Sequence, residues 1–119
     1  GLSEFTKLSK LELGHLQLRL HDLLQITALT GLRELTFKQC HIDIENWGRA
    51  VCFLELKNLE KLSFITSPTL DAYGLNELVT GHNSLKHLTL IHCPNICWHI
   101  YNDLRNLNRV QIEFIQGEL

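Results

Sequence analysis

The sequence predicts an α/β fold in which about five strand–helix repeats coil into a right-handed solenoid. A parallel β-sheet is expected on the concave side and helices on the convex side. Three observations support this prediction. An apolar-x-x-apolar-x-apolar pattern occurs five times in the 119 residues, and the first anchors of successive copies are 22 to 27 residues apart. Apolar residues with helical spacing lie between the copies.

Each copy of the pattern predicts one strand that carries three apolar anchors. The anchors are Leu8, Leu11 and Leu13; Leu32, Leu35 and Phe37; Leu59, Leu62 and Phe64; Leu85, Leu88 and Leu90; and Leu107, Val110 and Ile112. The last two anchors of each copy are two residues apart, so they share one face of a strand. A single copy is common by chance, whereas five copies at similar spacing indicate a repeat.

Four segments between the strands have the apolar spacing of a helix. Their apolar residues are Leu20, Leu23, Leu24, Ile26 and Leu29; Trp47, Val51, Leu54 and Leu56; Tyr73, Leu75, Leu78 and Val79; and Trp98, Tyr101 and Leu104. Gly48 weakens the second of these helices. Asp71 is a suitable N-cap for the third, which is expected to end near Gly81.

The position eight residues after each first anchor is expected to hold a small polar or thiol side chain, because the chain leaves the strand there and packs closely inside the coil. The five occupants are Leu16, Cys40, Ser67, Cys93 and Ile115. The three middle ones fit this requirement. The two that depart from it fall in the first and last repeats, where atypical residues are expected.

Residues 69–78 read Thr-Leu-Asp-Ala-Tyr-Gly-Leu-Asn-Glu-Leu, and residues 84–96 read Ser-Leu-Lys-His-Leu-Thr-Leu-Ile-His-Cys-Pro-Asn-Ile. These stretches resemble the I-T-D-x-G-L-x-x-L and N-L-x-x-L-x-L-x-x-C-x-x-I segments of cysteine-containing leucine-rich repeats, which are characteristic of F-box proteins. His82 stands where that subclass has a second cysteine. The resemblance implies that residues 1–119 are one leucine-rich repeat domain of a longer protein. Such a domain would capture substrates for a cullin-type ubiquitin ligase, with the F-box outside this chain.

The composition is that of a globular chain, with 45% apolar residues, 20% charged residues and a net charge of −2. Lys and Arg form no basic stripe, so we expect no nucleic-acid partner. No apolar stretch has the length of a membrane span, and the first residues lack the pattern of a signal peptide. The four cysteines, at 40, 52, 93 and 97, form no paired framework. We therefore expect a reduced intracellular setting, cytoplasmic or nuclear.

The densest group of potential metal ligands is formed by His92, Cys93, Cys97 and His99. Zinc prefers thiolate and imidazole ligands, but the three residues between these two cysteines do not match a zinc knuckle. Neighbouring Cys–His pairs at 40–41 and 92–93 would point to opposite faces of a strand. A glycine-rich phosphate loop and catalytically spaced carboxylates are absent from the sequence. We expect no enzyme activity, no metal and no cofactor.

The residues between the anchors are expected to form three outward-facing columns across the strands. The first column is Lys10, Glu34, Lys61, His87 and Arg109; the second is Glu12, Thr36, Ser63, Thr89 and Gln111; and the third is Gly14, Lys38, Ile65, Ile91 and Glu113. The alternating charges of the first column predict surface ion pairs. Ile65 and Ile91 are predicted to lie side by side on the exposed face, and exposed β-branched apolar residues often mark a contact site.

The sequence therefore predicts that another protein binds to the concave face, unless a further segment of the protein covers it. The predicted partner-binding residues are Lys38, Lys61, Ser63, Ile65, His87, Thr89, Ile91, His92, Arg109 and Gln111. Leu2 and Phe5 near the start are interpreted as the tail of a preceding helix, and Phe114 and Ile115 lie close to the other end, so both ends of the repeat array are expected to expose apolar edges. An oligomer formed through these edges, or their burial by flanking repeats, is expected.

Three functions remain open at this point. The first is the substrate-recognition part of an F-box-like ubiquitin-ligase adaptor. The second is a ligand-sensing repeat region of an innate immune receptor, because Leu85 to Pro94 also resembles the Leu-x-x-Leu-x-Leu-x-x-Cys-Pro runs of plant sensors. Repeats of those sensors typically lack regular helices, whereas residues 71–81 have helical spacing. The third is a scaffold or assembly subunit of a larger complex.

Overall fold

The computed structural model describes residues 8–42, 53–68, 72–107 and 109–116. Its elements are β1 (Lys10–Gly14), β2 (Gln17–Leu18), α1 (Leu20–Thr27), β3 (Glu34–Lys38), β4 (His41–Ile42), β5 (Lys61–Ile65), α2 (Ala72–Gly81), β6 (His87–Ile91), α3 (Trp98–Asn106) and β7 (Gln111–Ile115). The architecture is α/β. A five-stranded parallel sheet has the order β1-β3-β5-β6-β7, and the short strands β2 and β4 form a second parallel pair.

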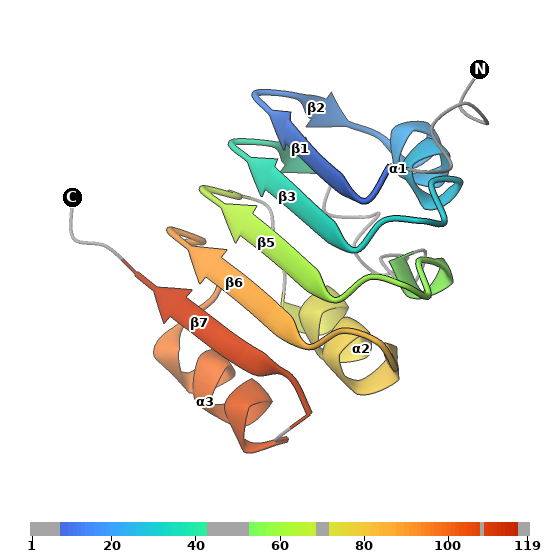
Figure 1. The fold of residues 1–119 in the computed structure, drawn as a ribbon. Coiled ribbons are helices and arrows are strands. Elements are labelled where there is room, and N and C mark those ends of the chain that lie inside the picture. The colour runs from blue at the N-terminus through green and yellow to red at the C-terminus, as the bar shows by residue number, and fades with distance from the viewer. Residues whose placement is uncertain (1–7, 43–52, 69–71, 108, 117–119) are drawn as a thin grey trace.

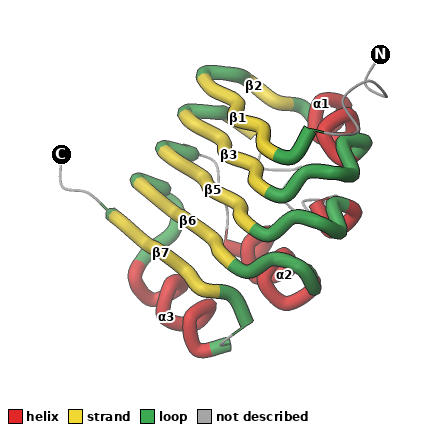
Figure 2. The backbone as a smooth tube through the Cα atoms, in the orientation of Figure 1, coloured by secondary structure: helices red, strands yellow, loops and turns green. Residues whose placement is uncertain are grey.

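The five long strands lie side by side in the order of the sequence, and the three described helices lie on one side of their sheet (Figures 1 and 2). Parallel neighbours require a crossover connection. Here α1, α2 and α3 lie in the connections β1–β3, β5–β6 and β6–β7. One face of the sheet is thereby buried and the other is left open to solvent.

The buried face is formed by the predicted apolar anchors. Leu35, Leu62 and Leu88 are fully buried, and each pairs with the next across the sheet. The rings of Phe37 and Phe64 stack with their centroids 5.3 Å apart. Complete burial of such side chains contributes about 1.5–3 kcal/mol each, so this ladder is the main source of cohesion between the strands.

The helix predictions at residues 20–29, 73–79 and 98–104 are confirmed by α1, α2 and α3, and α2 ends at Gly81 as expected. In α1, Leu23 and Ile26 face the core, whereas Leu24 is 52% exposed. The proposed N-cap Asp71 and most of the second predicted helix lie outside the described residues. The described end of that segment is a short 3₁₀ turn at residues 53–55, followed by the buried Leu56.

The sequence-derived register of the fifth strand is wrong by two residues. Ile112 pairs with Leu88, and Phe114 pairs with Leu90, whereas Val110 and Ile112 were expected at these positions. Leu107 is not a strand anchor, because its N–H donates to the carbonyl of Leu104 at the end of α3 and its side chain is 41% exposed. A two-residue shift keeps each side chain on its expected face but moves it to a different column.

The chain leaves four strands through the same left-handed turn. His15, Gln39, Thr66 and His92, each the first residue after its strand, have φ between 52° and 58°. Their N–H groups donate to the carbonyls of the last residues of the next strands, at 2.7–2.9 Å. The left-handed region costs a non-glycine residue roughly 1–2 kcal/mol. Because the left-handed conformation recurs after four strands, we infer that the connection leaving the sheet requires it.

Candidate binding face

The open side of the sheet presents three columns of side chains whose members are neighbours in the strand register. The first column is Lys10, Glu34, Lys61, His87 and Gln111; the second is Glu12, Thr36, Ser63, Thr89 and Glu113; and the third is Gly14, Lys38, Ile65, Ile91 and Ile115. The predicted column positions of the residues on β1, β3, β5 and β6 are confirmed. The fifth strand contributes Gln111, Glu113 and Ile115 in place of Arg109, Gln111 and Glu113.

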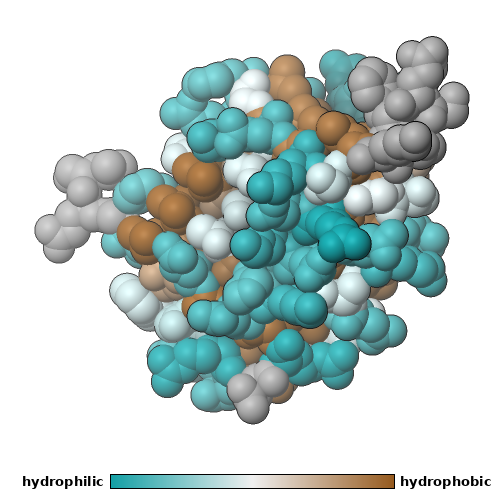
Figure 3. All heavy atoms as spheres, viewed as in Figure 1, coloured by the Kyte–Doolittle hydropathy of each residue, from teal (hydrophilic) through white to brown (hydrophobic). Residues whose placement is uncertain are grey.

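Ile65, Ile91 and Ile115 form a continuous apolar row, called the isoleucine row below, at the carboxyl ends of β5, β6 and β7. Each pairs with the next in register. Ile65 and Ile91 are half-buried and Ile115 is 43% exposed. Figure 3 shows hydrophobic residues following one another along this edge of the face. Ile115 was not among the predicted site residues, because the alternation Val110-Ile112-Phe114 is equally compatible with a register shifted by two residues.

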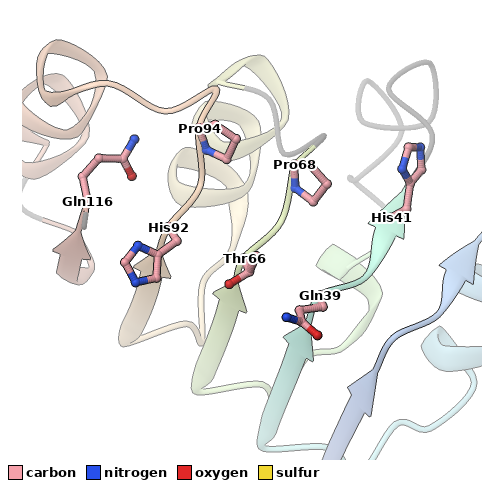
Figure 4. Close-up of a pocket in the computed structure, with 7 residues that line it drawn as sticks. All are labelled: Gln39, His41, Thr66, Pro68, His92, Pro94 and Gln116. Atoms are coloured by element: carbon pink, nitrogen blue, oxygen red, sulfur yellow. The ribbon is translucent and has the colours of Figure 1, made fainter. Parts of the chain in front are cut away.

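An open hollow of about 510 Å³ adjoins the isoleucine row. It is lined by Gln39, His41, Thr66, Pro68, His92, Pro94 and Gln116. Figure 4 shows these side chains on the segments that follow β3, β5, β6 and β7. Three of them, Gln39, Thr66 and His92, are the left-handed residues, so the repeated turn shapes this wall. Of the predicted site residues, only His92 lines it.

A charged rim lies at the opposite, amino-terminal ends of the strands. It consists of Lys10, Arg33, Glu34, Glu60, Lys61 and Lys86. The carboxylate of Glu34 lies 3.0 Å from Nζ of Lys10 and 3.6 Å from Nζ of Lys61, which agrees with the predicted alternation of charges. Glu60 lies 3.7 Å from Arg33 and 3.3 Å from Lys86. The hydrogen bond from Lys10 is the largest of the effects that lower the pKa of Glu34 below its ordinary value.

The remaining predicted site residues are distributed over the face. Lys38 lies next to the isoleucine row and pairs with Glu12 at 3.1 Å. Ser63 and Thr89 are half-buried neighbours in the middle of the sheet, and His87 is exposed beside Lys61. Arg109 is exposed but precedes β7, so it belongs to no column.

Cys40 and Cys93 are buried at the position expected for a thiol. The Sγ of Cys40 donates to the carbonyl of Leu13 at 3.4 Å, and the Sγ of Cys93 donates to that of Phe64 at 3.5 Å. Burial raises the pKa of Cys93, which disfavours a nucleophilic thiolate. Ser67 occupies the equivalent position and is also buried. Ile115, which the sequence pattern assigned to this position in the last repeat, instead pairs with Ile91 and belongs to a face column.

The four potential metal ligands of the sequence analysis differ in burial. Cys93 is buried, whereas Cys97 and His99 are exposed at the start of α3, and His99 lies 3.7 Å from Asp103. Among the described residues, no group of three or more His, Cys, Asp or Glu side chains could hold a metal ion.

His82 is a buried residue that holds two connections together. Its Nε2 lies 3.0 Å from the carbonyl oxygen of Leu56, and its Nδ1 lies 3.1 Å from the backbone nitrogen of Leu85. This geometry fits a neutral imidazole in which Nε2 donates and Nδ1 accepts. Burial lowers the pKa of His82 below its ordinary value. The residue is therefore structural.

In the described part of the chain, no helix has both the length and the apolar character needed to cross a membrane. Comparisons with known protein families, with curated proteins and with solved structures gave no match.

Proposed function

We propose that this chain is a protein-interaction module that binds a partner protein through the open face of its sheet. In this proposal the strands and helices form a right-handed leucine-rich-repeat solenoid of about five repeats, and the open face is its concave side. The isoleucine row is the observation that carries the proposal. Three β-branched apolar side chains stand in register on a solvent-facing sheet, where polar residues are the norm.

The energetics of the row support a contact role. Full burial of an isoleucine contributes about 1.5–3 kcal/mol, and the part of each side chain that is still exposed is available to a partner. The neighbouring Ser63 and Thr89 are small, so a partner could approach the sheet closely. Thr66, His92 and Gln116, which line the hollow, directly follow the three isoleucines in the chain, so a single partner segment could reach both.

Within this class, a substrate-recognition part of an F-box-like ubiquitin-ligase adaptor remains the leading proposal. The helices α1, α2 and α3 favour it over an immune-sensor repeat region, in which regular helices are typically absent. A scaffold or assembly subunit would use the same face. The proposal assigns the chain no catalytic role.

The test compares three forms of the protein in affinity capture from cell extract, quantified by mass spectrometry. Ile65→Asp/Ile91→Asp places two carboxylates in the isoleucine row and should abolish capture of specific partners. Leu24→Asp makes the same kind of change on α1, where the side chain is 52% exposed, and should capture the same proteins as the unmodified chain. Equal capture by all three forms, with unchanged circular dichroism, would refute binding through this face.

A further inference from the structure

The open face is polarised along its strands. At the amino ends, the charged rim holds four cationic and two anionic side chains, a surplus of two positive charges. At the carboxyl ends lies the isoleucine row. Figure 3 shows hydrophilic residues over the first region and hydrophobic residues along the second. Along one strand, the residue of the first column and the residue of the third column are four positions apart, which corresponds to about 13 Å.

The two rim carboxylates are already satisfied. Each of Glu34 and Glu60 is shared between two cations. Within the described part of the chain, each rim cation therefore has only half of a counter-charge, and the side chains of Lys61, Arg33 and Lys86 remain 57–68% exposed. Lys57 is also exposed. Together with Arg33 and Lys86 it lines a second hollow, distinct from the one beside the isoleucine row. Such a rim attracts negative charge from a partner.

The other carboxylates of the face lie on its outer strands. Glu12 is on β1, where Lys38 pairs with it, and Glu113 is on β7. On β5 and β6, the residues between the rim and the row are Ser63 and Thr89, which are neutral. Among the described residues, a path across the centre of the face therefore leads from positive charge to apolar surface without meeting an acidic side chain.

We propose that the partner presents an acidic, amphipathic segment to this face, an inference that rests on the proposed function. Carboxylates of the segment lie against Lys61, Arg33 and Lys86, and its apolar side chains lie on the isoleucine row. An extended segment that runs along the strands would carry its acidic residues about four positions from its apolar ones, because the two regions are about 13 Å apart.

The probe is a phage-displayed library of short random peptides, selected on the immobilised unmodified protein at about 0.1 M salt and, separately, at about 1 M salt. The Debye length falls from about 10 Å to about 3 Å between these conditions. At low salt we expect enrichment of peptides in which Asp or Glu residues lie about four positions from an apolar pair. At high salt their affinity should fall about tenfold.

Variants then locate the charge contact. Lys61→Gln/Lys86→Gln should weaken the selected peptides about tenfold and reduce their salt dependence. Arg105→Glu alters charge on the exposed surface of α3 and should bind like the unmodified protein. If the double variant folds poorly, the salt dependence of peptide binding to the unmodified protein gives the same information.

The outcomes separate this inference from the function on which it rests. The selected peptides could lack acidic residues and bind the unmodified protein but not the Ile65→Asp/Ile91→Asp variant. This result would overturn the acidic-partner proposal and leave binding through the face intact. Peptides that bind equally well to that variant, or no enrichment at either salt concentration, would overturn both.

Discussion

Ser67 occupies a buried position that is filled by cysteine in two other connections of the same sheet. Its hydroxyl oxygen is buried and has no hydrogen-bond partner among the described residues. The thiols of Cys40 and Cys93 contact main-chain carbonyls at the equivalent positions. A thiol is less costly to bury than a hydroxyl without a partner.

We therefore expect Ser67→Cys to stabilise the protein by about 1 kcal/mol. The reciprocal change, Cys93→Ser, should destabilise it by a similar amount. Urea unfolding under reducing conditions measures both. A destabilising Ser67→Cys would mean that this connection has no room for a thiol.

His82 should make stability depend on pH. Its folded-state pKa lies below the unfolded value near 6.5, because burial disfavours the charged ring. The unfolded chain therefore binds the proton more readily, and the free energy of unfolding falls as pH drops from about 6.5 towards the folded pKa. Urea midpoints at about pH 7.5 and about pH 5.5 should show this loss. In His82→Gln, the part of the pH dependence that belongs to this residue should disappear.

At the scale of the elements, α3 and β7 form an aromatic cluster that fixes the last strand. The ring centroids of Phe114 lie 4.7 Å from Trp98 and 5.0 Å from Tyr101, and Phe114 is 9% exposed. These contacts explain why the strand is shifted. The register places a large aromatic side chain in the core opposite Leu90, where the sequence pattern placed Ile112.

Two alanine substitutions distinguish these registers. Phe114→Ala should cost about 3 kcal/mol, because it removes a buried aromatic side chain and leaves a cavity. Leu107→Ala should cost less than about 1 kcal/mol, because the side chain is 41% exposed at the end of α3. Thermal or urea unfolding of both variants measures the difference. The opposite ranking would restore Leu107 as an anchor of the strand.

At the scale of the whole molecule, cohesion is greatest in the middle of the sheet. Leu35, Leu62 and Leu88 are fully buried, whereas Leu11 on β1 and Ile112 on β7 are only partly buried. Both outer strands also have a neighbour on one side only within the described sheet. Local opening should therefore begin at these two strands.

Hydrogen exchange tests this gradient. Hydrogen-bonded amides of β5 should exchange at least about tenfold more slowly than those of β1 and β7. Equal protection in all five strands would instead indicate that the sheet opens only as one unit. A partner or a second copy that covers an outer strand would be detected as increased protection there.

The sequence by itself determined the existence of the five long strands and of α1, α2 and α3, and the side of the sheet on which each strand residue lies. Strand alternation and helical spacing are local properties, and they are fixed by the apolar pattern. The same pattern placed Ile65 beside Ile91 and put Cys40 and Cys93 inside. It could not decide the register of the last strand, because a shift by two residues preserves the alternation.

Tertiary structure alone decided four further features: the place of Ile115, the left-handed turns, the hollow and the sharing of Glu60 between Arg33 and Lys86. The physical reason is common to all of them. Each depends on which residues of neighbouring strands come to lie side by side, and that is settled by packing such as the contact of Phe114 with α3. Gln39, Thr66 and His92 carry no glycine-like signal for a positive φ, so only the folded chain shows the turn.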